Sequence, residues 1–124
     1  MKRISFAALC NLFMLCFSLS CGLSHHNISI HISDSEHYFK MYAHYNPSQT
    51  EAVDECMNKH LGRRNSISFN NTQIDADLTL DDGTKLYIKK NPGKLEIKFN
   101  KNENSLASYK EIKDLSEGLK TAMQ

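Results

Sequence analysis

The strongest constraint on the fold is an alternation of apolar and polar residues that recurs in separate segments of the chain. Such alternation predicts strands with one buried and one exposed face, which is typical of an antiparallel sheet covered on one side. The apolar members are Ile28, Ile30 and Ile32; Phe39, Met41 and Ala43; Ile74, Ala76, Leu78 and Leu80; Leu86 and Ile88; and Leu95, Ile97 and Phe99. The pattern therefore predicts one sheet of about five strands.

Turn residues link the first two predicted strands. Asp34-Ser35-Glu36 is typical turn chemistry, and a tight hairpin around Ser35 and Glu36 brings Ile32 near Phe39 and Ile30 near Met41. Both apolar sets then lie on the same face of the sheet, so the pairing is self-consistent.

A second hairpin is predicted at Asp81-Asp82-Gly83. A two-residue loop would turn the next strand's apolar side away from the core. A three-residue loop with Gly83 in a left-handed conformation instead pairs Leu78 with Leu86 and Ala76 with Ile88. The hydrophobic pattern selects the second loop.

Two segments have helical rather than strand periodicity. Residues 48–61 have apolar side chains at helical spacing after Ser48 and Glu51, which have capping-box spacing, and this periodicity places Asp54 on the outer side of the helix. The last segment has an apolar stripe from Leu106 to Leu119, with Ser105 and Ser108 as alternative N-caps. Both helices are amphipathic and can cover a sheet.

The predicted fold class is therefore α+β, with an antiparallel sheet of about five strands and two helices packed on one face. The order is strand-strand-helix-strand-strand-strand-helix, and residues 28–124 form a single domain. We expect one core that contains Ile30, Met41, Val53, Leu78, Ile88, Ile97, Ile112 and Leu115.

The first twenty residues differ from the rest of the chain. Lys2 and Arg3 precede an apolar run from Ile4 to Leu19, and small residues end it at Ser18 and Ser20. This arrangement predicts a secretory signal peptide over residues 1–20, followed by a tether over residues 21–27.

Cys21 stands directly after the expected cleavage point and is followed by Gly22. The segment resembles a bacterial lipoprotein precursor, in which the cysteine after the cut becomes the lipid-bearing first residue. The resemblance covers residues 1–22 and implies an exported, lipid-anchored protein of the cell envelope, with the membrane reached through the lipid alone. Leu19 lies two residues before Cys21 rather than the family's usual three, so a soluble periplasmic or secreted protein, with Cys21 free to pair with Cys56, stays open.

Charge excludes some functions. Fifteen Lys and Arg nearly balance fourteen Asp and Glu, whereas nucleic-acid binders and polybasic membrane modules carry a clustered basic excess. We expect no nucleic-acid partner and no cofactor.

The histidines are the candidate metal ligands. His31 and His44 share one predicted sheet face, but in the predicted hairpin they are diagonal or farther apart, with no carboxylate or thiolate fixed beside them. Cys56 and His60 have i, i+4 spacing, but Cys56 falls on an apolar stripe, where a thiol stays protonated. No catalytic residue is predicted.

The sheet face away from the helices carries tyrosine, lysine and histidine, a combination suited to recognition. The candidate binding residues are Tyr38, Lys40, Tyr42, Tyr87 and Lys89. The sequence favours a non-enzymatic domain that binds a protein or an envelope polymer through this face. The alternative is a metal-binding protein or a small metal-dependent enzyme that uses His31 and His44.

Overall fold

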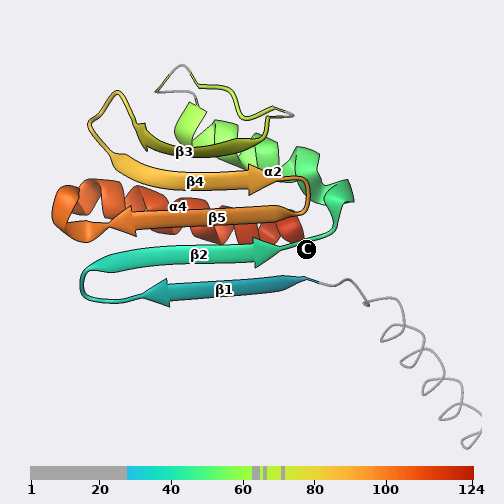
Figure 1. Cartoon of the computed structure of the whole chain (residues 1–124), viewed down its shortest axis with the longest axis horizontal. Helices are drawn as coiled ribbons and strands as arrows, with labels where there is room; N and C mark the ends of the chain where they lie inside the picture. Colours follow the sequence, from blue (N-terminus) through green and yellow to red (C-terminus); the bar gives the residue numbers. More distant parts are fainter. Residues whose placement is uncertain (1–27, 63–64, 66, 71) are drawn as a thin grey trace, which may run out of the picture.

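The computed structural model describes residues 28–62, 65, 67–70 and 72–124 (Figure 1). The signal peptide over residues 1–20, the tether over residues 21–27 and Cys21 lie outside these residues. The α+β prediction is confirmed, because the described chain contains a five-stranded antiparallel sheet and two α-helices. The strands are β1 (Ser29–Asp34), β2 (Tyr38–His44), β3 (Ile74–Thr79), β4 (Lys85–Asn91) and β5 (Lys94–Asn100), and the helices are α2 (Thr50–Met57) and α4 (Leu106–Met123).

The sheet has the strand order β1-β2-β5-β4-β3, so β5 is central and β1 and β3 are the edges. Both helices lie behind the sheet in Figure 1, which leaves the opposite face of the sheet uncovered. We call this uncovered side the open face. None of the helices in the described part of the chain has the length and hydrophobicity of a transmembrane span.

The core lies between the sheet and the helices. Met41, Val53, Ile88, Ile97, Ile112 and Leu115 are all buried, as the sequence predicts. Ile30 and Leu78 are only half-buried, because they belong to the two edge strands and have fewer neighbours. A short strand through Ile67 and Phe69 is also compatible with the sequence, but both residues lie in a loop, from which the fully buried Phe69 fills the core.

The two hairpins differ in how well the sequence predicts them. The β3–β4 register pairs Leu78 with Leu86 and Ala76 with Ile88, as predicted, and Gly83 has a φ of 87°. A positive φ is accessible to glycine at little cost, which explains the residue at this turn.

The predicted β1–β2 register is wrong by two residues. Ile32 pairs with Met41 and Ile30 with Ala43. The Ser35 N–H donates to the Tyr38 carbonyl at 2.9 Å, so the loop is centred one residue later than predicted. A shift of two residues leaves each side chain on its expected face.

The first helical segment begins earlier and ends differently than predicted. Asn46, rather than Ser48, is the cap: its side chain accepts from the Ser48 N–H ahead of a 3₁₀ turn, η1 (Pro47–Gln49). The Pro47 ring favours this early start, since its fixed φ suits a first helical residue. After Met57 the chain continues as a π-helical turn, η2 (Asn58–Gly62). At α4, Ser105 is the cap and accepts from the Ser108 N–H.

One ion pair is buried beneath the sheet. Helical periodicity places Asp54 on the outer side of its helix, but Asp54 is buried and its Oδ1 lies 2.8 Å from Lys90 Nζ. Lys90 occupies a core-facing position of β4 and also donates to the Thr72 carbonyl at 2.7 Å. The pair therefore fastens α2 to the sheet through two charges removed from water.

A second polar network holds the β1–β2 hairpin, which carries Tyr38, against the turn after β5 and the start of α4. Lys101, in the 3₁₀ turn η3 (Lys101–Glu103) after β5, donates to Asp34 at 2.5 Å, and the Tyr109 hydroxyl also donates to Asp34. Hydrogen bonds from Lys101 and then Tyr109 hold the pKa of the Asp34 carboxyl below its usual range.

Candidate binding surface on the open sheet face

The strand register places the predicted recognition residues in two neighbouring rows across the sheet. One row runs through His31, Tyr42, Glu96, Lys89 and Asp75, and the next through Ser33, Lys40, Lys98, Tyr87 and Asp77. Tyr42 and Lys89 therefore flank Glu96, while Lys40 and Tyr87 flank Lys98. Tyr38 lies two residues before Lys40 on β2, and it is 44% exposed.

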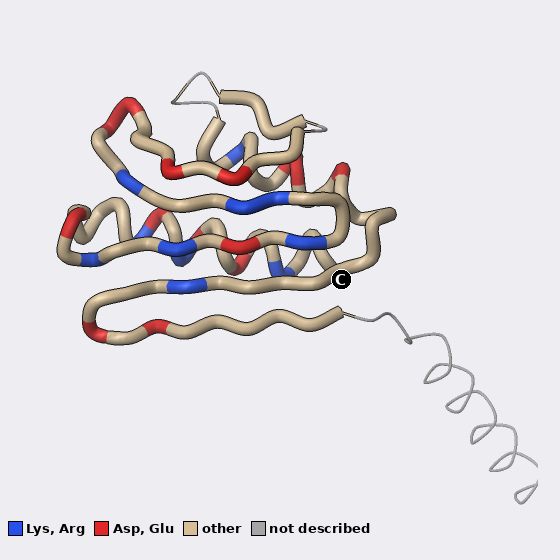
Figure 2. The backbone as a smooth tube through the Cα atoms, viewed as in Figure 1, with Lys and Arg blue, Asp and Glu red and all other residues tan. Residues whose placement is uncertain are grey.

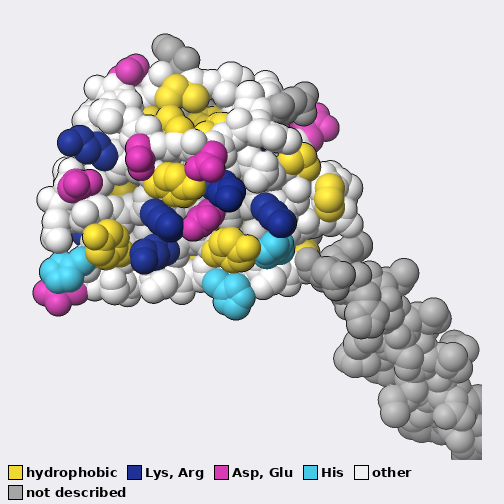
Figure 3. All heavy atoms as spheres, in the orientation of Figure 1, with side chains coloured by type: hydrophobic (Ala, Val, Ile, Leu, Met, Phe, Trp, Pro, Cys, Tyr) yellow, Lys and Arg dark blue, Asp and Glu magenta, His cyan; other side chains and the backbone are white. Residues whose placement is uncertain are grey.

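Charge alternates along this surface rather than forming a single-sign patch. Figure 2 shows lysines along β2, β4 and β5 and carboxylates on β3 and in the middle of β5. In Figure 3 the lysines and the hydrophobic side chains intermingle over the same strands. A surface of this kind can contact a partner through rings and exchange hydrogen bonds at many points.

Two lysines lie over tyrosine rings. Lys40 Nζ is 5.3 Å from the Tyr38 ring centroid, and Lys98 Nζ is 5.3 Å from that of Tyr87. These distances are within cation–π range. Lys40 and Lys98 are also directly opposite each other on β2 and β5. The Lys98 ammonium is also 3.3 Å from Glu96, so the positive charge of this row is partly balanced by a carboxylate on the same strand.

The Tyr87 hydroxyl is fixed by a carboxylate on the edge strand. It donates to Asp75 Oδ1 at 2.5 Å. This hydrogen bond raises the pKa of Tyr87 to about 12, with smaller contributions from desolvation and from the charges of Asp75, Glu96 and Asp77. The bond holds the ring in one orientation on the open face.

Asp75→Asn should therefore lower the pKa of Tyr87 from about 12 toward the ordinary value of 10.0, because the amide does not stabilise the protonated phenol as a carboxylate does. Since the folded-state pKa is the higher one, the bond contributes stability below pH 10.0, and that contribution is lost as pH rises through about 12. Tyrosinate absorbance against pH measures the shift. Asp77→Asn is the matched control and should change the curve far less. Identical curves for wild type and Asp75→Asn would contradict the assignment.

The two histidines do not converge on a metal site. The Tyr42 hydroxyl and His44 Nε2 are 2.8 Å apart, and His31 Nε2 lies 3.0 Å from the Ser29 hydroxyl. Across the described residues, no group of three or more His, Cys, Asp or Glu side chains is arranged to hold a metal ion. Both rings instead extend the polar surface of the open face beside Tyr42.

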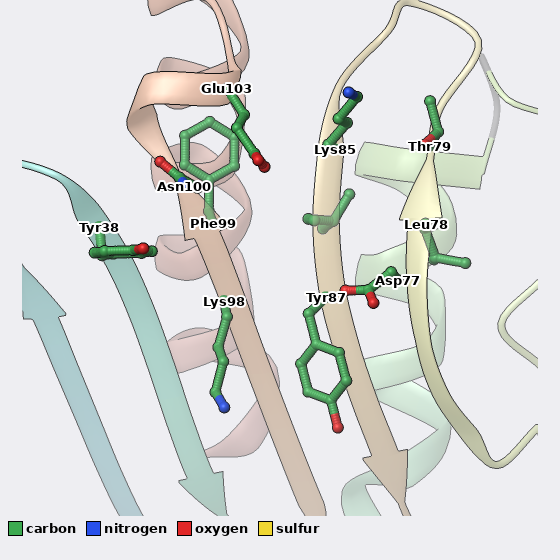
Figure 4. Close-up of a pocket in the computed structure, with 11 residues that line it drawn as sticks. Tyr38, Asp77, Leu78, Thr79, Lys85, Tyr87, Lys98, Phe99, Asn100 and Glu103 are labelled. Atoms are coloured by element: carbon green, nitrogen blue, oxygen red, sulfur yellow. The ribbon is translucent and has the colours of Figure 1, made fainter.

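A shallow hollow of about 550 Å³ opens on this face at the end near the β3–β4 turn. Tyr38, Lys98 and Tyr87 border it, and Asp77, Glu103 and Asn100 add acceptors and a donor (Figure 4). A smaller hollow of about 150 Å³ lies beside Tyr42 and Lys89. The alternation that predicts Tyr87 also predicts Asp77, but Glu103 comes from η3 and has no periodic signal.

Cys56 and His60 pack against Gly118 of α4. A Cβ on Gly118 would lie 2.9 Å from Cys56 Sγ and 3.2 Å from His60 Nε2, so the absence of a side chain there allows this packing. Burial raises the pKa of the half-buried Cys56 thiol, and nearby Lys59 opposes this only in part. The thiol is thus kept protonated, in agreement with the sequence prediction.

No protein family, curated protein or solved structure matches this chain. The case for a function therefore depends on the geometry of the open face.

Proposed function

We propose that this chain is a non-enzymatic binding module that engages a protein or an envelope component through its open face. The observation that carries the proposal is the arrangement of Tyr38, Tyr42 and Tyr87 beside lysines on one uncovered sheet face that also contains the larger hollow. Tyr38 and Tyr42 are 44% and 43% exposed, so their rings are available to a partner.

The rings and the lysines have different roles in this proposal. Tyrosine offers a large contact area with little loss of side-chain entropy, and aromatic residues dominate the affinity of many interfaces. Charged groups at the rim mainly raise the association rate and its dependence on salt. Export and lipid attachment at Cys21 belong to the same proposal, and they are supported by the signal-like residues 1–22.

The double variant Tyr42→Ala/Tyr87→Ala should weaken partner binding by at least about tenfold, because it removes two rings that would form the centre of the interface. Affinity capture from an envelope extract, followed by titration of each captured component, measures the effect. Leu106→Ala removes a side chain that is 71% exposed on α4, and this control variant should retain binding.

Circular dichroism and thermal melting establish that both variants are folded. A folded double variant that retains every captured component at wild-type affinity would exclude the open face as the binding site. Stoichiometric zinc or copper in the purified protein, lost on His31→Ala, would instead favour the metal-binding alternative.

A further inference from the structure

We infer that β1 forms the contact of a symmetric dimer, in which the β1 strands of two copies pair antiparallel across a two-fold axis at His31. The inference goes beyond the proposed function, because it concerns an edge of the sheet rather than the open face. Among the described residues, β1 pairs only with β2, so one side of its backbone can accept another strand. In Figure 1, β1 is the outer edge of the sheet and neither helix extends past it.

The backbone groups of Ile30 and Ile32 point toward this edge. The Ser35 N–H donates to the Tyr38 carbonyl, which makes these two residues a hydrogen-bonded pair across the β1–β2 hairpin. Such pairs recur at every second residue of an antiparallel ladder, so the backbone groups of His31 also face β2. Ile30 and Ile32 alternate with these positions and direct their N–H and carbonyl groups outward. A second strand can therefore bond to β1 without disturbing its pairing with β2.

The sequence of this edge is symmetric about His31. Residues 29–33 read Ser-Ile-His-Ile-Ser, which is the same in both directions. In a two-fold contact the same patch of each copy must complement itself, and an antiparallel pair centred on His31 matches Ser29 with Ser33 and Ile30 with Ile32 of the second copy. Ile30 and Ile32 then form the hydrogen-bonded pairs, and the two His31 residues form the non-hydrogen-bonded pair between them.

The side chains also suit a second copy. Ile32 is 36% exposed, although it lies on the helix-covered side of the sheet with its buried strand partner Met41. Pairing with Ile30 of the second copy removes Ile32 from water. In the same register Asp34 lies opposite Ile28 of the second copy. The two Asp34 carboxylates are then at opposite ends of the contact, so like charges do not meet.

The two edges of the sheet differ in how they are protected. β3 carries Asp75 and Asp77, and charged side chains on an edge strand oppose its pairing with another chain. Residues 29–33 of β1 include no lysine, carboxylate, proline or glycine. The difference selects β1 as the edge that pairs. Because opposed residues lie on the same side of a sheet, the dimer joins the open faces of both copies into one surface.

Sedimentation equilibrium of the purified protein over a broad range of concentration tests the inference, and we expect a monomer–dimer equilibrium. Ile32→Pro should weaken dimerisation by at least about tenfold, because it removes an outward N–H and leaves the β1–β2 ladder intact. Asp77→Pro is the matched control on the other edge. The Leu80 N–H donates to the Thr84 carbonyl, so alternation directs the Asp77 N–H outward, and this variant should dimerise as the wild type does. Circular dichroism establishes that both variants are folded.

Cysteine cross-linking tests the register without a proline. Opposed Cα atoms of a non-hydrogen-bonded pair are about 4.5 Å apart, which a disulfide can span, so His31→Cys should cross-link two copies under a mild oxidant. Ser33→Cys is the matched control, because its two cysteines would lie about 14 Å apart along the paired strands. It should cross-link at least about tenfold more slowly. Non-reducing denaturing electrophoresis measures both rates, and the wild type, which keeps Cys56, gives the background.

Three results would each overturn the inference: a protein that stays monomeric at every concentration, a folded Ile32→Pro variant that dimerises as the wild type does, or equal cross-linking of the two cysteine variants. A monomeric protein that loses a captured envelope component on Ile32→Pro would show that the edge pairs with a strand of another protein, and it would exclude the second copy as the occupant. The test of the open face with Tyr42→Ala/Tyr87→Ala is separate from these results.

Discussion

Lys90→Met should lower the free energy of unfolding by about 3–5 kcal/mol, because it removes the ammonium that lies 2.8 Å from the buried Asp54 carboxylate. The side chains of Lys90 and Asp54 are only 2% and 4% exposed, and water cannot replace the lost partner. The loss of the bond to the Thr72 carbonyl adds to the effect. Urea unfolding at neutral pH, monitored by circular dichroism, measures the difference.

The controls separate the buried charge from the loss of a lysine. Lys94→Met changes the same residue type at an exposed position of the adjacent strand and should shift stability by less than about 0.5 kcal/mol. The double variant Lys90→Met/Asp54→Leu removes both charges and should recover much of the loss. A loss below about 1 kcal/mol for Lys90→Met alone would show that the pair is not buried in solution.

The sequence predicts the strands well because alternation directly reports which face is buried. It fixes the β3–β4 register, since the rival loop would expose Leu86 and Ile88 on the wrong side. It does not fix the β1–β2 register, where Ile32 pairs with Met41 rather than Phe39. A shift of two residues leaves every side chain on the same face of the sheet, so the hydrophobic pattern alone cannot distinguish the two pairings.

Charged residues in core positions are the feature of this fold that the sequence pattern predicts least well. Helical periodicity predicts Asp54 on the exposed side of its helix, but the residue is buried. Lys90 is a charged residue at a core-facing position of β4. Charged side chains are rarely buried unless they are paired, and the partners here are distant in the sequence. Only the packing of α2 against the sheet reveals that each is the counter-charge of the other.

The candidate binding surface is also predicted from the sequence only in part. Tyr38, Lys40, Tyr42, Tyr87 and Lys89 reach the open face because strand parity sends them there. The hollow also needs Glu103, whose position depends on how η3 turns after β5. The sequence pattern can therefore predict which residues lie on the open face. The shape of the hollow depends in addition on turns and on the twist of neighbouring strands.

Leu115→Ala should lower the free energy of unfolding by about 2–5 kcal/mol, because the surroundings refill the removed volume only in part. Leu115 is 0% exposed and belongs to the stripe of α4 that packs beneath the sheet. Leu106→Ala makes the same truncation in the same helix at a position that is 71% exposed, and it should cost less than about 0.5 kcal/mol. Chemical denaturation of the three proteins gives the comparison directly. Equal stabilities for the two variants would show that α4 does not cover the sheet, and the open face would then lose its rigid support.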